Sequence, residues 1–112
     1  MMQLNKTKCL ELINSYCDFL PRKYTLKDIY FYKYFKENKN KHFIMNFFID
    51  DYVYMKFIVT NYKNGEVRLA VNVHRYVEEN DKYVCTRRGT LYFRNDAVVF
   101  NSLKEEDLEI YE

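Results

Sequence analysis

The sequence predicts one α+β domain in which two N-terminal helices pack on one face of a five-stranded antiparallel β-meander. Three observations predict this fold. Apolar residues recur at helical spacing near the N-terminus, they alternate with polar residues from His42 onward, and turn-forming residues interrupt the alternation at intervals. The chain of 112 residues is long enough to bury one core, which we assign to a domain over residues 1–103. Residues 104–112 are assigned as an acidic C-terminal tail.

The first predicted helix runs from about residue 5 to residue 20. Asn5 or Thr7 can cap its start, and Pro21 ends it because the residue before a proline is disfavoured in the helical region. Its apolar residues fall three and four positions apart, which forms one wide face for burial. These positions are Cys9, Leu10, Leu12, Ile13, Tyr16, Cys17, Phe19 and Leu20.

A second helix is favoured over residues 25–38. Thr25 with Asp28 resembles a capping box, which is typical of a helix start. The Tyr and Phe residues between 29 and 35 have high strand propensity, so a strand over 29–35 stays open as the alternative. Such a sixth strand would cover a sheet edge or close a barrel. Residues 36–41 are polar and basic and are expected to connect this segment to the sheet.

Asn64 and Gly65 lie between two alternating runs, which predicts a β-hairpin. A two-residue loop would mix apolar and polar residues on each face. We therefore expect a three-residue loop that pairs Tyr62 with Glu66 and holds Gly65 in a left-handed conformation. This register places apolar residues of both strands side by side on one face: Met55, Phe57 and Val59 beside Val73, Val71 and Leu69.

The preceding turn is predicted at Asp50 and Asp51. A three-residue loop there would pair Phe48 with Tyr52. This register extends the apolar face to the preceding strand, which supplies Phe43, Met45 and Phe47.

Two later turns are marked by polar residues at 79–81 and 94–96. They delimit strands at about 83–93 and 97–102. The pattern does not fix the register of these last two strands, partly because Gly89 is a candidate β-bulge.

The opposite face of the predicted sheet carries aromatic and cationic residues together. Aromatic rings pack against partner side chains or stack on bases, and cations bind carboxylates or phosphates. Tyr54, His74 and Tyr76 are the expected anchors, and Lys56, Arg68 and Arg88 are expected to set orientation and association rate. The candidate partner-binding residues are Tyr52, Tyr54, Lys56, Arg68, Asn72, His74, Tyr76 and Arg88.

We interpret the chain as a small non-enzymatic binding or regulatory protein that docks a partner protein on this face. Other interpretations stay open, because tyrosine also sits on half-exposed sheets without a ligand and because a homodimer would cover the same face. The alternative from another class is a single-stranded RNA or DNA module, which would add the basic connector Lys33, Lys36, Lys39 and Lys41.

An enzyme is not expected. His42 and His74 both fall in predicted strands, where histidine is more often a packing or surface residue than a base. Cys85 could pair with His74 as thiol and imidazole, but the favoured register directs them to opposite faces. No cofactor motif is recognised.

A metal site is not expected either. Three Cys and two His show no zinc-ligand spacing. Asp50 or Asp51 followed by Glu66 loosely resembles a metal-nuclease pattern, but these residues lie at opposite ends of one long predicted strand.

Composition predicts a cytoplasmic, reducing environment. The three cysteines form no CxxC pair, the N-terminus lacks an apolar signal segment, and no apolar run is long enough to span a membrane. The Asn-, Lys- and Tyr-rich composition is typical of AT-rich genomes, which indicates a viral, phage or low-GC bacterial origin. The net charge is +2, divided between a body of +6 and a tail of −4, so the tail could compete with a ligand for the basic face.

Overall fold

The computed structural model describes residues 3–103, and the predicted acidic tail lies outside these residues. The described chain has one α-helix and a six-stranded antiparallel sheet, so the prediction of two helices on a five-stranded meander is wrong. The elements are α1 (Lys6–Tyr16), 3-10 turn η1 (Leu26–Asp28), β1 (Phe31–Glu37), β2 (Asn40–Asp50), β3 (Val53–Asn61), β4 (Val67–Val77), 3-10 turn η2 (Glu78–Asn80), β5 (Lys82–Arg94) and β6 (Ala97–Asn101).

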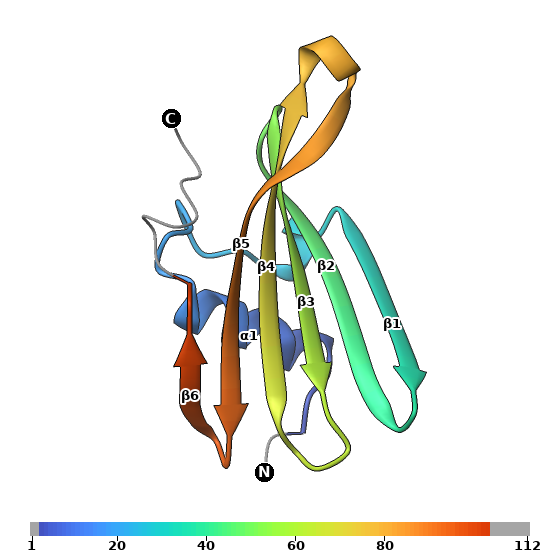
Figure 1. The fold of residues 1–112 in the computed structure, drawn as a ribbon, viewed down its shortest axis with the longest axis vertical. Helices are drawn as coiled ribbons and strands as arrows, with labels where there is room; N and C mark the ends of the chain where they lie inside the picture. Colours follow the sequence, from blue (N-terminus) through green and yellow to red (C-terminus); the bar gives the residue numbers. More distant parts are fainter. Residues whose placement is uncertain (1–2, 104–112) are drawn as a thin grey trace.

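The six strands form one meander in which each strand pairs with the next along the chain. Helix α1 lies across one face of this sheet (Figure 1). The hairpin of β4 and β5 extends beyond the other strands at one end, where η2 closes it (Figure 1). A meander with one covering helix leaves the second face of the sheet without a covering element in the described chain.

Helix α1 begins as predicted and ends early. The Asn5 side chain accepts a hydrogen bond from the Lys8 backbone N–H at 2.8 Å, which caps the first turn. The predicted extension to residue 20 is wrong, because Cys17 has φ −107° and ψ 75°, outside the helical region. The chain then turns, and Phe19 and Leu20 pack against the core from this turn instead of from a helix.

The predicted second helix is replaced by a single 3-10 turn and strand β1. The Thr25–Asp28 capping box forms, with the Thr25 backbone N–H donating to Asp28 Oδ2 at 2.7 Å. It starts only η1, after which Phe31–Glu37 pairs with β2. The strand propensity of the aromatic residues and the free edge of β2 together outweigh the helix-start signal. The basic connector expected at 36–41 is a tight hairpin between β1 and β2.

The hairpin of β3 and β4 has the predicted register. Tyr62 donates its backbone N–H to the Glu66 carbonyl at 2.8 Å, and Gly65 has a positive φ of 91°. Glycine suits this position because it carries no Cβ to clash with the backbone. The apolar pairs follow as expected: Met55 with Val73, Phe57 with Val71 and Val59 with Leu69.

The register between β2 and β3 differs from the prediction by two residues. Phe48 pairs with Tyr54 instead of Tyr52, and the ladder shifts between Phe48 and Asp50. The Asp50 side chain accepts the Tyr52 backbone N–H at 2.8 Å, which tightens the turn. Because the shift is an even number of residues, each side chain keeps its predicted face.

A β-bulge at Thr86 interrupts the pairing of β4 with β5. Val73 pairs with Arg87, but the next residue of β4, His74, pairs with Cys85. The predicted candidate, Gly89, lies in regular pairing opposite Val71. The turns expected at 79–81 and 94–96 are present, and β5 and β6 lie close to their predicted ranges.

The core lies between α1 and the face of the sheet that it covers. Cys9, Leu10 and Ile13 of α1 pack onto alternate residues of the strands. Phe47 and Phe57 are fully buried, with ring centroids 5.7 Å apart. The sheet supplies the remaining large buried side chains, among them Phe43, Met45, Met55, Val59, Leu69, Val71, Leu91 and Phe93.

We expect Phe57→Ala to lower the free energy of unfolding by about 3–5 kcal/mol, because it leaves a cavity at the centre of this core. Urea unfolding followed by circular dichroism measures the change. The matched control is Tyr52→Ala, whose side chain is 65% exposed and whose removal should cost less than about 1 kcal/mol. Equal losses for the two variants would contradict the division of the sheet into a buried and an open face.

Candidate binding face

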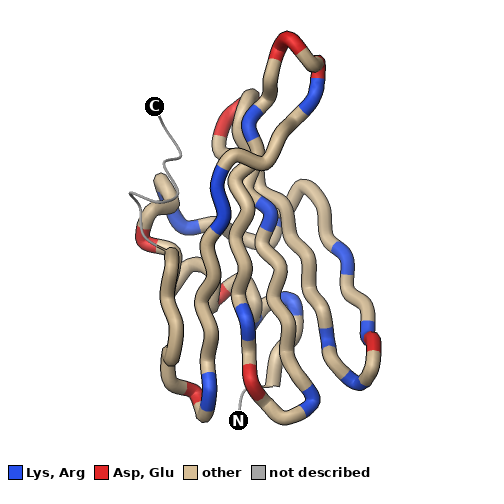
Figure 2. The backbone as a smooth tube through the Cα atoms, viewed as in Figure 1, with Lys and Arg blue, Asp and Glu red and all other residues tan. Residues whose placement is uncertain are grey.

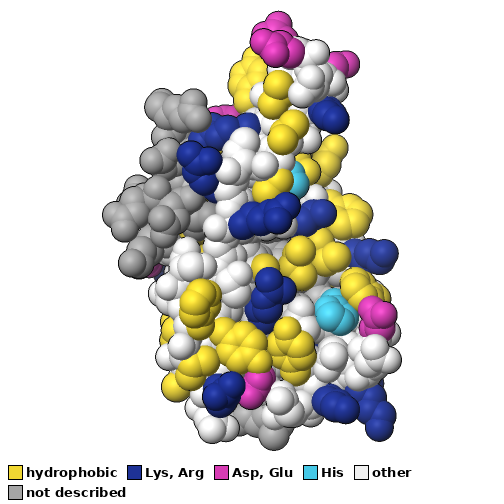
Figure 3. Space-filling view, in the orientation of Figure 1, with side chains coloured by type: hydrophobic (Ala, Val, Ile, Leu, Met, Phe, Trp, Pro, Cys, Tyr) yellow, Lys and Arg dark blue, Asp and Glu magenta, His cyan; other side chains and the backbone are white. Residues whose placement is uncertain are grey.

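The face of the sheet opposite α1 is here called the open face. Alternate residues of the strands point to it, and in Figure 3 it shows hydrophobic, cationic and histidine side chains gathered together. Carboxylates lie toward its margins in the same view (Figure 3). The face is therefore aromatic and cationic, as the sequence predicts.

Seven rings form a continuous cluster toward the end of the open face where the β4–β5 hairpin extends, here called the distal aromatic cluster. Tyr54 stacks on His74 with ring centroids 4.6 Å apart and planes 4° from parallel. Tyr83 contacts Phe48, Tyr54 and Tyr76 edge to face. The members are Tyr30, Phe48, Tyr52, Tyr54, His74, Tyr76 and Tyr83.

Strand pairing and hydrogen bonds hold these rings in place. Phe48, Tyr54 and His74 stand opposite one another on β2, β3 and β4. Tyr83 donates its hydroxyl to the Asp51 carbonyl at 2.8 Å, and Tyr76 donates its hydroxyl to the Asp81 carboxylate. The hydroxyl partners lie in the turns at this end of the sheet, so the rings are fixed from two sides.

A row of polar residues crosses the open face next to the cluster. Lys56, Asn72 and Arg88 stand opposite one another on β3, β4 and β5. Within residues 3–103, neither Lys56 nor Arg88 forms an ion pair. Two cations about 10 Å apart along the sheet are therefore available to an external anion.

His74 joins the aromatic cluster to this row. Burial, followed by the charges of Lys56 and Arg88, lowers the pKa of His74 below its ordinary value near 6.5. This shift favours the neutral imidazole at pH 7. His74 Nε2 and Asn46 Oδ1 are buried and have no hydrogen-bond partner within the described chain. Unsatisfied buried polar atoms are costly, so these two atoms lower the stability of the fold at this position.

The structure brings together seven of the eight predicted residues. Arg68 stands apart from them, between Thr60 and Tyr92 nearer the other end of the sheet. The others belong to the cluster or to the adjacent row: Tyr52, Tyr54, Lys56, Asn72, His74, Tyr76 and Arg88.

Three ring residues were missing from the predicted site: Tyr30, Phe48 and Tyr83. Alternation already directed Phe48 to the open face, so the sequence signal for it existed. The position of Tyr83 on the open face depends on the Thr86 bulge, because the bulge decides which residues at the start of β5 point to that face. The local sequence does not predict this bulge.

Cys85 lies opposite His74 because of the same bulge, so the prediction that they point to opposite faces is wrong. The Cys85 thiol contacts the Arg87 carbonyl at 3.6 Å, and no hydrogen bond to His74 occurs within the described chain. Cys9 and Cys17 are buried, and burial raises the pKa of each thiol to about 12. At neutral pH these two thiols are protonated and poor nucleophiles.

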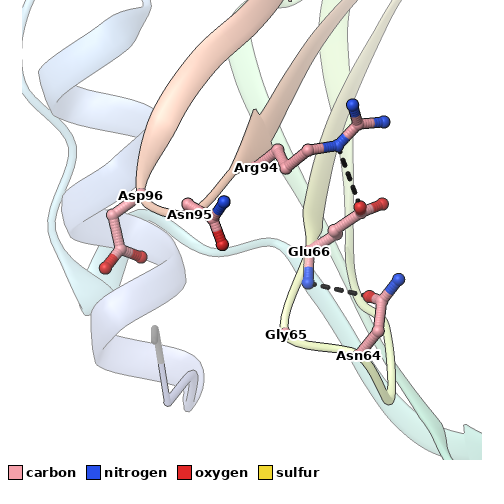
Figure 4. A pocket seen from close by; sticks show the side chains of 6 residues that line it. All are labelled: Asn64, Gly65, Glu66, Arg94, Asn95 and Asp96. Carbon is pink, nitrogen blue, oxygen red and sulfur yellow. Dashed lines mark hydrogen bonds and ion pairs between the residues drawn. The ribbon is translucent and has the colours of Figure 1, made fainter.

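A separate hollow of about 570 Å³ lies where the β3–β4 and β5–β6 turns approach each other (Figure 4). Two carboxylate residues, Glu66 and Asp96, line it. Glu66 binds Arg94 Nε at 3.0 Å and accepts a hydrogen bond from the Tyr92 hydroxyl. The hydrogen bond from Tyr92 has the largest effect on the pKa of the Glu66 carboxyl, and it and the bond from Arg94 both lower that pKa. Glu66 thus ties two turns together.

The metal-nuclease pattern stays divided in the structure, because Asp51 and Glu66 flank opposite ends of β3. No group of three or more potential metal ligands occurs within residues 3–103. None of the helices in that range has the length and apolarity to span a membrane.

No protein-family model matches the chain, and neither a curated protein nor a solved structure matches it.

We predict that His74 titrates below 6.5 and that Arg88→Gln raises its pKa, since a repelling charge is removed. NMR of the imidazole protons measures both values, with Lys27→Gln as a control for charge elsewhere. Between the lowered pKa of His74 in the folded state and its ordinary value of 6.5 in the unfolded state, the unfolded chain binds more protons. The free energy of unfolding therefore rises with pH in this interval and levels off above 6.5. A midpoint at or above 6.5 would contradict this environment.

Proposed function

We propose that the chain is a small non-enzymatic binding protein that docks a partner protein on the open face. The partner is expected to present an acidic segment with aromatic or aliphatic side chains. This chemistry complements the distal aromatic cluster and the adjacent cations, which lie side by side on one face.

The observation that carries the proposal is the position of His74 between the aromatic cluster and the cations of this face. His74 stacks on Tyr54 and lies close enough to Lys56 and Arg88 for their charges to lower its pKa. Tyrosine and arginine are the side chains that most often dominate binding energy at protein interfaces. Cations that no acid within residues 3–103 neutralises attract an acidic partner over distance and fix its orientation.

The fixed positions of the central rings also support the proposal. A ring that is already held by packing and by its hydroxyl loses little conformational freedom when a partner binds. Tyr76 and Tyr83 are held in this way, whereas Tyr30 and Tyr52 are 73% and 65% exposed at the margin of the cluster. The centre of the cluster is therefore preformed, and its margin can adapt to the partner.

The nucleic-acid alternative receives less support from the geometry. Lys33 lies on the open face, opposite Ile44. Lys36 and Lys41 stand opposite each other and point to the side that α1 covers, so the basic connector does not extend the open face. Among the described residues of the strands, a nucleic acid on this face would meet Lys33, Lys56, Arg68 and Arg88, and also Arg94, which Glu66 already neutralises.

We also propose that the protein acts in a reducing compartment, as the cytoplasm of a cell or of an infected host would provide. All three cysteines are free thiols in the structure. The other protein that could cover the open face is a second copy of this chain. The light-scattering measurement below distinguishes this homodimer from a complex with a different protein.

The test is binding of fluorescein-labelled peptides in which Glu alternates with Leu or Tyr, measured by fluorescence polarisation at low and physiological salt. We expect Arg88→Glu and Tyr54→Ala each to weaken binding about tenfold, because each removes a central contact. Lys27→Glu, which changes the same charge away from the open face, should bind like the unmodified protein. Light scattering of the free protein reports whether a second copy covers the face.

Peptide binding that is the same in all variants would overturn the proposal. Stronger binding of a single-stranded oligonucleotide, lost in Arg88→Glu, would replace it with the nucleic-acid function.

A further inference from the structure

A second cationic site lies away from the open face, where the β1–β2 and β3–β4 turns meet. Blue segments mark lysines in both of these turns at the same end of the sheet (Figure 2). Between them is a hollow of about 410 Å³, here called the four-lysine hollow. It is lined by Gln3, Lys36, Lys39, Lys41, Asn61, Tyr62, Lys63 and Gly65.

The lysines of this hollow are not neutralised by the described chain. No carboxylate lines the hollow, and none of its four lysines forms an ion pair within residues 3–103. Glu66, which follows the lining residue Gly65, is already bound to Arg94 and Tyr92. Glu37, which follows Lys36, points to the other face because side chains alternate along a strand.

Three of the lysines occupy positions that folding alone disfavours. Lys36 stands directly opposite Lys41 in the β1–β2 ladder, and like charges in that arrangement repel. Lys39 has a positive φ of 66° in the two-residue turn, a conformation for which glycine is preferred. A hairpin selected for stability alone would place an opposite charge and a glycine at these positions.

Hydrogen bonds between the turns hold the lysines together. The Lys63 backbone N–H donates to Asn40 Oδ1 at 2.9 Å, which joins the β3–β4 turn to the start of β2. Lys41 stands opposite Asn61, whose buried side chain donates to the Glu66 carbonyl at 3.4 Å. The repulsion among the four ammonium groups is therefore resisted by the fold and is not relieved by separation of the turns.

We propose that the four-lysine hollow binds the phosphate groups of a phosphorylated ligand. Four ammonium groups around one hollow create a potential that favours a multiply charged anion over a single carboxylate. The hollow is large enough for a pyrophosphate group, and Tyr62 is the one aromatic residue among those that line it. The site is independent of the partner-binding face, since Lys36 and Lys41 point to the side of the sheet that α1 covers.

The test is isothermal titration of the full chain with inorganic pyrophosphate, and separately with oligodeoxythymidylate, at low and physiological salt. Pyrophosphate represents a free phosphorylated ligand, and the oligonucleotide represents a phosphate backbone. We expect Lys36→Gln and Lys63→Gln each to weaken binding about fivefold. Lys82→Gln, at the opposite end of the sheet, is the matched control and should leave affinity unchanged.

Lys39→Gly separates binding from folding. Glycine relieves the left-handed strain, so the melting temperature should rise while affinity for the anion falls. Binding of either probe that depends on these lysines would support the site and would identify its source. Absence of binding by both probes, or binding that Lys36→Gln and Lys63→Gln leave unchanged, would overturn it.

Discussion

The alternation of apolar and polar residues along the strands is the constraint on which the rest of the structure depends. In a strand, successive side chains point to opposite faces, so one apolar set must be buried and the other set must meet solvent or a partner. The described chain offers one α-helix to cover the sheet, and α1 covers the face that carries Phe47 and Phe57. The second face is left to side chains that tolerate both water and contact, chiefly tyrosine, histidine, lysine and arginine.

The same constraint explains why the faces could be predicted better than the pairing. The β3–β4 register follows from Gly65 and the requirement for one apolar face, and it is correct. The β2–β3 register is wrong by two residues, yet every side chain keeps its face because the shift is even. The Thr86 bulge is an odd shift, and it brings Cys85 opposite His74. Single-residue bulges depend on long-range fit between strands, which local pattern does not encode.

Two other features, strand β1 and the four-lysine hollow, could not be predicted from local sequence patterns for a different reason. Residues 31–37 carry a helix-start signal before them and strand propensity within them, and the unpaired edge of β2 decides between the two. The four-lysine hollow depends on the hydrogen bond between Asn40 and Lys63, which lie 23 residues apart in sequence. The sequence therefore predicts the composition of the binding face and most of its members, while sites formed between separate turns emerge only in three dimensions.

The central claim is that the open face is uncovered in the free protein and available to a partner. Solvent paramagnetic relaxation with a neutral gadolinium chelate tests it most directly, measured on ring protons of the full chain at two protein concentrations. The account predicts strong relaxation of Tyr52 and Tyr76, weak relaxation of Phe47 and Phe57, and no change with concentration. Protection of Tyr52 and Tyr76 equal to that of Phe57 would contradict it, and protection that grows with concentration would show that a second copy covers the face.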